Sequence, residues 1–477
     1  MKKIIISKLF LYRHRFIIGY LLLSLLFVSI LFTFPLFTQD GLSETEITSA
    51  TTSAELTLQT IFQGNLVDLP FHFLQKLSIK IFGLTIYAIK LPSILIGLAL
   101  GLLFTLLLNR WFKSNVSLLT SCLIVLSTPF LFLAGSGTPL IMLVFWPTFL
   151  LWLGSKIQGE KHPEPSYCII FAIALFLALF TPYMIYFAIF CILFVIFQPH
   201  LRFIIKNLPK LSLIFTGLTI AINLLIFIIH ISLNPSTLLE LLFTPNFNLH
   251  LFFTNLIDGF RPVFSWRNSS ENIFLSPLIS LPTFALALIG LFSTTKGFFA
   301  SRNSIASLLI IFAIIITGFN PRAIIFLILP LSILTAHGIK YLLEKWYGLF
   351  PENPYARISA IFPLFILFSI IIFSGLSQYV YGYRYNPNVA NEFNNHLSLI
   401  HQHLNNETLV VSEHFNFYQL LSDSTSIQVV AQPNTSKTLA FFKKPLILPP
   451  DYQLIRIITS EKSDNSDIIY IYTREGE

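Results

Sequence analysis

The first segment whose residue types could do chemistry is Gly41-Leu42-Ser43-Glu44-Thr45-Glu46-Ile47, directly after the first long apolar run. Its two carboxylates, Glu44 and Glu46, stand where a membrane-spanning chain first leaves the bilayer. A carboxylate held there can act as general base on the hydroxyl group of an acceptor. Ser43 followed three residues later by Glu46 is also the pattern of a capping box, which would give Glu46 a structural role at a helix N-terminus. The residues alone leave both interpretations open.

A second set of polar residues follows at helical spacing. Pro70 is suited to the first turn of a helix that runs toward Phe82. Two of its faces would be an apolar stripe of Leu66, Phe73, Leu74, Leu77 and Ile81, and a polar row of Asp68, His72, Lys76 and Lys80. A helix of this kind lies along a membrane surface. We expect Asp68, His72 and Lys76 to contact substrate there; the alternative is an ordinary interfacial helix whose polar row is solvated.

Charged residues near the ends of later apolar runs form the third candidate group. Asp258-Gly259-Phe260-Arg261-Pro262 is the densest charged cluster in its region, and Arg322 follows Asn320-Pro321 in a very short polar connection. The planar guanidinium fork binds two phosphate oxygens at once. We therefore expect Asp258, Arg261 and Arg322 to contact a phosphate-bearing substrate. The alternative for each arginine is that it anchors a helix end or contacts lipid headgroups.

The composition indicates the elements that must position these residues. Hydrophobic residues make up 55% of the chain and charged residues 11%, against about 25% charged residues in soluble domains. We expect an all-α polytopic membrane protein with about 11 transmembrane helices of roughly 20 apolar residues, near residues 16–37, 86–108, 116–133, 140–154, 167–180, 184–198, 211–231, 273–294, 304–318, 323–336 and 358–378. The net charge of +8 comes from Lys and Arg in short loops. This is the positive-inside pattern of a membrane protein and argues against nucleic acid as a partner.

The apolar stretch 167–198 is too long for one ordinary span. Thr181-Pro182-Tyr183 can divide it, because proline removes a backbone donor. With this division the multi-pass chain has a cytoplasmic N-terminus and an extracytoplasmic C-terminus at the cell membrane. We expect a membrane domain at 1–378, with outer loops at 38–85 and 232–272, and an extracytoplasmic tail domain at 379–477.

The tail is expected to be a small α/β domain. It lacks long apolar runs and gains Asn, Ser, Asp and Glu. Alternating or β-branched segments predict strands at Thr408–Ser412, Ser426–Ala431, Gln453–Thr459 and Asp467–Thr473. A helix is expected over Asn391–Leu404.

The sequence has no motif for a nucleotide, a metal ion or a redox group. It contains no Gly-rich phosphate loop, no nucleophile elbow and no Cys/His metal spacing. Its three cysteines, Cys122, Cys168 and Cys191, lie in apolar runs and fit a packing role rather than a disulfide framework. We therefore predict no metal and no other cofactor.

Phe82-Gly83-Leu84-Thr85 and Ile89-Lys90-Leu91-Pro92-Ser93 follow the acidic motif and the amphipathic stretch. With these motifs, residues 41–93 resemble the C-type glycosyltransferases, and among them the family-39 group of protein mannosyltransferases and bacterial aminoarabinose transferases. Family members show an Asp-Glu pair after the first span, where this chain has Thr45-Glu46, and an arginine where it has Lys90. Their second outer loop carries another acidic residue, but residues 134–140 carry none here.

The resemblance implies transfer of a sugar from a polyprenyl-phosphate donor to a lipid, glycan or protein acceptor of the cell envelope, with inversion. Glu46 is the first candidate for the base and Glu44 the second, since Thr45 takes no proton at neutral pH. One alternative is a catalytically degenerate member that binds a lipid-linked sugar or an envelope partner. Another is a lipid or polysaccharide transporter. Transporters usually bury charges within their spans, whereas these spans are almost free of charge, which favours an interfacial site.

Overall fold

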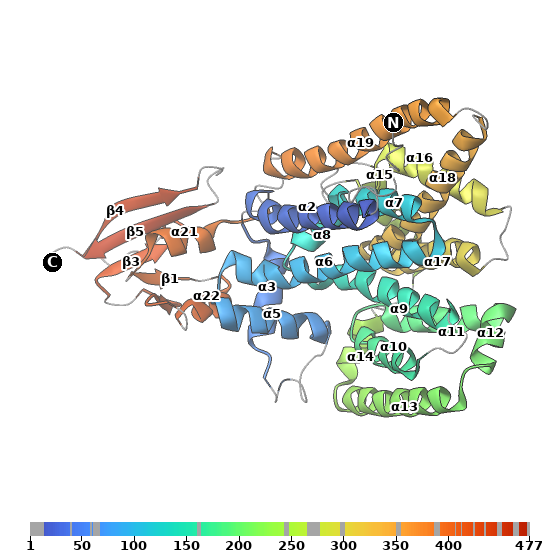
Figure 1. Ribbon diagram of the computed structural model, residues 1–477. Helices are drawn as coiled ribbons and strands as arrows, with labels where there is room; N and C mark the ends of the chain where they lie inside the picture. The colour runs from blue at the N-terminus through green and yellow to red at the C-terminus, as the bar shows by residue number, and fades with distance from the viewer. Residues whose placement is uncertain are drawn as a thin grey trace.

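The computed structural model describes most of the chain, namely residues 14–38, 41–57, 60, 67–159, 164–242, 248–264, 277–295, 301–349, 354–385, 392–405, 407–411, 413–422, 425–433, 436–445, 451–460 and 467–474. These residues form a helical membrane part and a small C-terminal domain with a sheet (Figure 1). The predicted fold class, a mainly helical polytopic protein with a small α/β domain, is thereby confirmed.

The helices of the membrane part follow the hydropathy of the sequence. In chain order they are α2 (Arg15–Thr38), α3 (Glu44–Ala54), α5 (Leu69–Phe82), α6 (Ile86–Trp111), α7 (Ser114–Val125), α8 (Thr128–Gly135), η2 (Pro139–Ile141), α9 (Met142–Gly159), α10 (Pro165–Ala178), α11 (Met184–Phe197), α12 (Pro199–Lys206), α13 (Lys210–Leu233), α14 (Pro235–Leu242), α15 (Leu249–Phe264), α16 (Leu281–Thr295), α17 (Ser301–Phe319), η3 (Pro321–Leu327), α18 (Ile328–Leu349) and α19 (Pro354–Tyr385).

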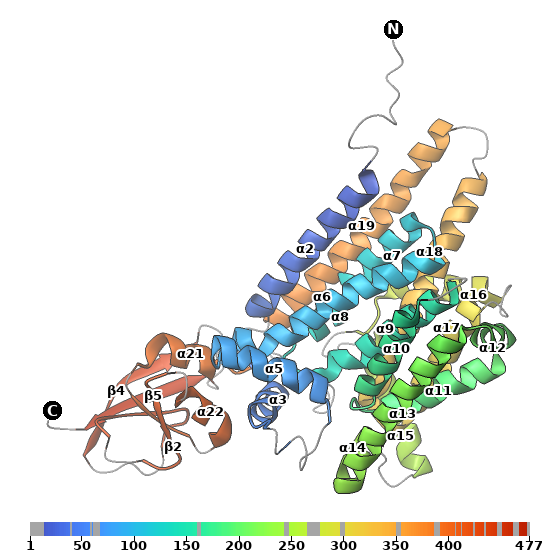
Figure 2. The same cartoon turned by 60° about the horizontal axis from the view of Figure 1, so that its bottom comes forward.

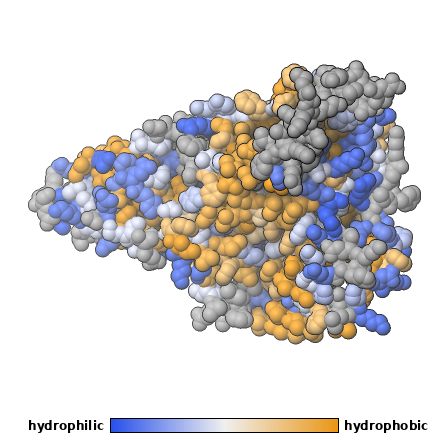
Figure 3. Space-filling model, viewed as in Figure 1, coloured by the Kyte–Doolittle hydropathy of each residue, from blue (hydrophilic) through white to orange (hydrophobic). Residues whose placement is uncertain are grey.

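Each predicted span coincides with an apolar helix. Among the described residues, 7 helices are long and apolar enough to cross a membrane, and the bent pairs α7–α8 and α11–α12 raise the number to 9. The two remaining predicted spans are the shorter apolar helices α10 and α16. Helix α19 extends to Tyr385, beyond residue 378 where the last predicted span ends. Hydrophobic residues cover much of the middle and lower part of this region in the view of Figure 3.

The division of the long apolar stretch is confirmed. Helix α10 ends at Ala178 and α11 begins at Met184, with Thr181 and Pro182 in the turn between them. Tyr183, the N-cap of α11, has a φ of 65°, which is the left-handed region. The bend between α11 and α12 is 92°, so α12, which carries Arg202 and Lys206, turns away from the direction of the span.

Two helices of the first outer loop pack across the N-terminal end of α6. Helices α3 and α5 lie next to each other between α6 and the C-terminal domain in both ribbon views (Figures 1 and 2). The apolar stripe of α5 is exposed, with Phe73, Leu77 and Ile81 all open to the surroundings. This arrangement agrees with the expected interfacial helix. Leu66 lies outside the described residues.

The C-terminal domain is a five-stranded mixed sheet with two helices. Its elements are α21 (His396–His403), β1 (Thr408–Val410), α22 (Phe415–Ser422), β2 (Gln428–Val430), β3 (Thr438–Phe441), β4 (Tyr452–Thr459) and β5 (Ile468–Arg474). The strand order is β2-β1-β3-β5-β4. Strand β1 is parallel to β2 and β3, whereas β5 is antiparallel to β3 and β4. All four predicted strands are present, while β3 and α22 were not expected, and α21 is shorter than the predicted helix.

Candidate functional site

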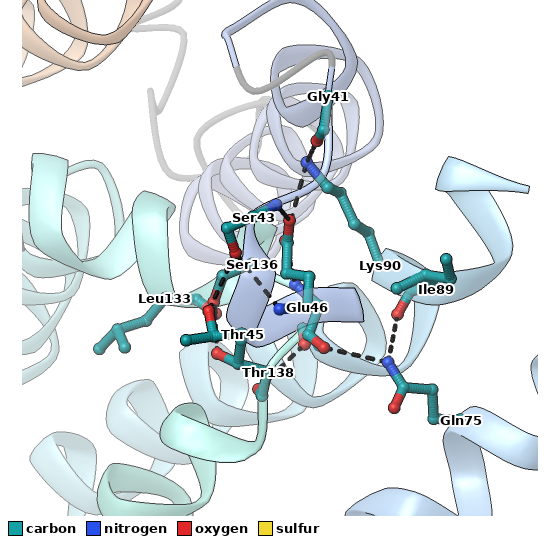
Figure 4. Close-up of polar contacts among 12 residues, drawn as sticks. Gly41, Ser43, Thr45, Glu46, Gln75, Ile89, Lys90, Leu133, Ser136 and Thr138 are labelled. Carbon is teal, nitrogen blue, oxygen red and sulfur yellow. Dashed lines mark hydrogen bonds and ion pairs between the residues drawn. The ribbon is translucent and has the colours of Figure 1, made fainter. Parts of the chain in front are cut away.

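The capping box expected at Ser43 is formed, and it determines where Glu46 lies. The hydroxyl of Ser43 accepts from the backbone N–H of Glu46 at 3.3 Å, and Glu46 Oε2 accepts from the N–H of Ser43 at 2.9 Å. The other oxygen, Oε1, accepts from the N–H of Gly137 at 2.6 Å. The side chain of Glu46 is wholly buried, with 0% exposure. Figure 4 shows the carboxylate between the start of α3 and the 136–138 turn.

Lys90 is the cation of this cluster. Its Nζ lies 3.8 Å from Glu46 Oε1 and donates to the carbonyl of Gly41 at 3.0 Å. Lys90 is as buried as Glu46, so the two charges form a buried ion pair. In the sequence, Lys90 stood out only because family members have arginine at that position. No spacing pattern in the sequence predicts that Lys90 pairs with Glu46. The turn at 134–140, which lacks a carboxylate of its own, thus receives one from Glu46.

Glu44 and Thr45 lie on the open side of α3. The side chain of Glu44 is exposed, with Oε1 4.0 Å from Nε2 of His414 in the C-terminal domain. The hydroxyl of Thr45 lies 2.9 Å from that of Ser43. A third carboxyl group, Glu392, was not predicted: partial burial raises its pKa, and the nearby charge of Glu46 raises it further.

The polar row of α5 is divided: Asp68 and His72 are buried, whereas Lys76 is part-exposed and Lys80 is exposed. His72 is buried against α3, where its Nδ1 lies 2.7 Å from the hydroxyl of Ser53. Burial lowers the pKa of His72 to about 4, so the imidazole is neutral. Gln75 extends this contact. Its Oε1 accepts a hydrogen bond from the Ser53 hydroxyl at 2.6 Å. Its Nε2 donates to the carbonyls of Ile89 and Gly137, each at 3.0 Å. His72 and Gln75 therefore join α5 to α3, and Gln75 also joins it to α6.

Lys76 also binds α3. Its Nζ donates to the carbonyl oxygens of Leu56 and Ala54, at the C-terminal end of that helix. The last carbonyls of a helix have no partner within it and carry partial negative charge, which a lysine satisfies. Lys80 is exposed. Lys76 Nζ is thus bound to the end of α3, and its contact with substrate stays a prediction.

Asp68 begins a second cluster at the other end of α5. It is the N-cap of that helix, with a φ of 55°, and its side chain is 8% exposed. Its N–H donates to the carbonyl of Phe180 at 2.7 Å, which ties it to the α10–α11 turn. Burial raises the pKa of Asp68 to about 8, and a hydrogen bond with the Thr181 side chain partly offsets this effect.

Tyr183 connects Asp68 with Arg322. Burial raises the pKa of the Tyr183 phenol; the positive charge of Arg322 lowers this pKa, and Asp68 raises it. The Tyr183 ring packs against that of Phe326 on η3, with ring centroids 6.3 Å apart. Arg322 is exposed at the start of η3, where its N–H donates to Oδ1 of Asn320 at 2.9 Å. No described residue forms an ion pair or hydrogen bond with its guanidinium group. The α10–α11 turn therefore contacts both Asp68, through Phe180, and η3, which begins next to Arg322.

Asp258 and Arg261 form an exposed ion pair one turn apart on α15. Arg261 Nη1 lies 2.7 Å from Asp258 Oδ1. Between them, Gly259 lies against Thr317 and Pro321, where an added Cβ would meet the Thr317 side chain. The pair therefore lies close to the start of η3. Six predicted residues thus fall into two groups. Glu44 and Glu46 lie at the start of α3, and the second group, near the start of η3 and the α10–α11 turn, consists of Asp68, Asp258, Arg261 and Arg322. His72 and Lys76 lie on α5, between the two groups.

A groove opens on the side of the membrane part. Its volume is about 1080 Å³, and it lies between residues 277–282 and one face of α19. Its lining is mainly apolar, with Ile279, Phe373 and Tyr381, and includes polar groups such as Gln378. Among the described residues, no group of three or more His, Cys, Asp and Glu side chains could hold a metal ion.

Part of the chain matches a known protein family. Residues 69–227 match the family model of dolichyl-phosphate-mannose-protein mannosyltransferases. A search of curated protein sequences finds no match to the chain.

Solved structures match the chain far more completely than any sequence does. ArnT from Cupriavidus metallidurans, crystallised with undecaprenyl phosphate, matches 95% of this chain and 98% of its own, with a TM-score of 0.57 and 10% identity. The oligosaccharyltransferase from Archaeoglobus fulgidus in its apo form matches 89% of this chain and 65% of its own, with a TM-score of 0.54 and 13% identity. The same archaeal enzyme in complex with an inhibitory peptide and a dolichol-phosphate gives a TM-score of 0.50 at 12% identity. The resemblance expected from residues 41–93 is confirmed: the chain has the fold of the C-type membrane glycosyltransferases, and a third of its length matches their protein mannosyltransferase family.

Proposed function

We propose that this protein is an integral membrane glycosyltransferase that transfers a sugar from a polyprenyl-phosphate donor to a cell-envelope acceptor at the outer face. The observation that carries the proposal is the agreement of fold over nearly the whole chain with ArnT, whose structure holds undecaprenyl phosphate. The match of residues 69–227 to a family that uses a lipid-phosphate sugar supports the same donor class. The groove beside α19 is of a size and apolarity that suit a lipid chain.

The reaction needs a base for the acceptor hydroxyl. The acceptor oxygen attacks the anomeric carbon, the bond from that carbon to the phosphate oxygen breaks, and the acceptor proton passes to a carboxylate. Glu46 and Glu44 are the carboxylates that the sequence offers for this step. Because Glu46 is buried and both of its oxygens are already hydrogen-bonded, we assign it a positioning role. Glu44, exposed at the first turn of α3, is the carboxylate that an acceptor can reach.

The test is transfer by the purified full chain in lipid, with a radiolabelled pool of polyprenyl-phosphate sugars as donor. We expect Glu44→Gln to lower the turnover number at least a hundredfold, the usual contribution of a general base, while the donor still binds. Glu55→Gln, which alters an exposed carboxylate at the other end of α3, is the matched control and should keep wild-type turnover. Full activity of Glu44→Gln would contradict the assignment of the base.

One observation favours a second candidate function. Thr45 stands where family members have aspartate, and residues 134–140 lack the family's other acidic residue. A catalytically silent protein that binds a lipid-linked sugar would have lost these two groups. The same assay separates the candidates, because wild-type protein that binds the donor without releasing sugar would support the silent binder.

A further inference from the structure

The carboxyl group of Asp68 is buried without a cation. Among the described residues, no Lys, Arg or His lies within ion-pair distance of it, and its Oδ1 has no hydrogen-bond partner. An ionised carboxylate in such a place is costly, and the group responds by keeping its proton. The raised pKa of Asp68, about 8, has this burial as its main cause.

The direction of the surrounding hydrogen bonds locates that proton. The indole N–H of Trp146 donates to Thr181 Oγ1 at 3.1 Å, and an indole can only donate. The single hydroxyl hydrogen of Thr181 is therefore free to be given to Asp68. With Thr181 donating to Oδ2, Oδ1 is the carboxyl oxygen that has no partner. The proton of the neutral acid then lies on Oδ1, as a buried donor that lacks an acceptor.

The backbone around this donor is held in conformations that need outside support. Asp68 and Tyr183 are two of the three non-glycine residues with positive φ among those described. Each is fixed by a long-range hydrogen bond, from the N–H of Asp68 to Phe180 and from the N–H of Tyr183 to Leu241 at 3.1 Å. Such backbone strain persists where the surroundings impose it and is common at ligand sites.

We propose that neutral Asp68 and Arg322 together bind the phosphate of the lipid-linked donor, with the Asp68 Oδ1–H donating to one phosphate oxygen. Arg322 supplies the charge and Asp68 supplies a hydrogen bond, each from an element that contacts the α10–α11 turn. This inference rests on the proposed function, and it assigns to Asp68 and Thr181 a task at the leaving group that is separate from the base. When the sugar leaves, the phosphate gains the electron pair of the broken bond, and these donors stabilise the added charge.

The titratable groups near Asp68 determine how binding depends on pH. They are Tyr183 on the α10–α11 turn, Arg322 on η3, and His72 one turn along α5, which is neutral. Undecaprenyl phosphate, the lipid phosphate that remains when the sugar has left, is a monoester and a dianion above a pKa of about 6. Between pH 7 and 9, therefore, only Asp68 changes its charge among these groups. Ionised Asp68 loses its donor and repels the phosphate. Binding should therefore weaken as the pH rises through about 8.

The experiment measures the Kd of undecaprenyl phosphate for the full chain in nanodiscs at pH 7 and pH 9. We expect wild-type affinity to fall about tenfold between these values, as one group with a pKa of about 8 requires. Asp68→Asn keeps a neutral donor; it should bind within about threefold of wild type at pH 7, be independent of pH, and bind more tightly than wild type at pH 9. Arg322→Gln should weaken binding at both pH values and keep the wild-type pH dependence.

The outcomes separate the inference from the proposed function. If binding by the wild-type protein does not change with pH, the role of Asp68 is overturned and the donor class is left intact. This measurement uses the wild-type protein alone, so it does not depend on the folding of a variant. Loss of binding by Asp68→Asn at pH 7, with an unchanged thermal transition, would also overturn it. No binding of undecaprenyl phosphate by wild type at either pH would contradict both the inference and the proposed donor.

Discussion

At the scale of single residues, the most constrained group is the Glu46–Lys90 pair. Both side chains are buried, and each also forms hydrogen bonds with backbone groups. Glu46 accepts from the N–H groups of Ser43 and Gly137, and Lys90 donates to the carbonyl of Gly41. A buried ion pair adds little net stability relative to apolar residues, but removal of one partner leaves an uncompensated charge. The pair therefore acts as a local clamp that fixes the start of α3 against α6 and the 136–138 turn.

This clamp gives a prediction about stability. Glu46→Gln or Lys90→Met alone should lower the free energy of unfolding by about 3–5 kcal/mol, because each leaves one buried charge without its partner. The double variant should recover part of this loss. Thermal or denaturant unfolding in detergent measures it, with Glu44→Gln as an exposed control that stays near wild type. Single variants as stable as wild type would show that the cluster is not a buried ion pair.

At the scale of elements, the outer helices are positioned by polar contacts and the spans by close apolar packing. Helices α3, α5 and α6 meet through Ser53, His72 and Gln75. Helices α16 and α18 meet through Gly290 and Gly338, where the backbones approach so closely that an added Cβ would strike a carbonyl of the other helix. Small residues allow this close approach between membrane-spanning helices. In lipid the hydrophobic effect does not drive such helices together, so their association depends on close packing.

The glycine contact gives a prediction about helix packing. Gly290→Ala places its Cβ against the carbonyl oxygen of Leu334 in the facing helix, and rigid backbone cannot move aside as a side chain would. We expect the free energy of unfolding to fall by about 1–3 kcal/mol or more, which is the range for overpacked protein cores. Gly154→Ala on α9 is the matched control, since no atom lies within 4 Å of the added Cβ. The midpoint of thermal unfolding of the two variants distinguishes them; equal midpoints would contradict close packing of α16 and α18.

At the scale of the whole molecule, the C-terminal domain and the first outer loop form one body. A single apolar cluster includes Leu42, Ile47 and Ala50 from the loop with residues of α21 and the sheet. Leu42 pairs with Asn394 as an isolated β-bridge, and Nε2 of His401 lies 2.7 Å from the carbonyl oxygen of Leu84. The domain must therefore lie on the same side of the membrane as α3 and α5. Which side that is remains the prediction from the basic loops.

This shared body gives a prediction about topology. In a variant without native cysteines, Lys444→Cys should react with a membrane-impermeant thiol reagent added outside intact cells. Arg202→Cys, on the basic helix α12, should react only after the membrane is opened. Both side chains are exposed, and the positive-inside rule predicts that they lie on opposite sides of the membrane. Protection of position 444 in intact cells would reverse the orientation of the whole chain.

The elements that the sequence determined are those specified by short-range patterns. Runs of apolar residues determined the spans, because a backbone in lipid must satisfy its hydrogen bonds within the helix. The proline at 182 determined the break between α10 and α11. The Ser43–Glu46 spacing determined the capping box, which needs only neighbouring residues. The three-residue and four-residue strands β1 to β3 carry too little pattern for consistent prediction, and β3 was missed.

The tertiary structure alone decided what each polar face meets. The spacing of Asp68, His72 and Lys76 shows that they share one face of α5, but it cannot show that α3 and the α10–α11 turn cover that face. The same holds for Glu46 on α3 and Lys90 on α6, because the described helix α5 lies between them in the sequence. Burial, and with it the neutral form of Asp68, depends on atoms brought from distant parts of the chain. Periodicity reports only the neighbours along one helix, so these long-range contacts had to come from the fold.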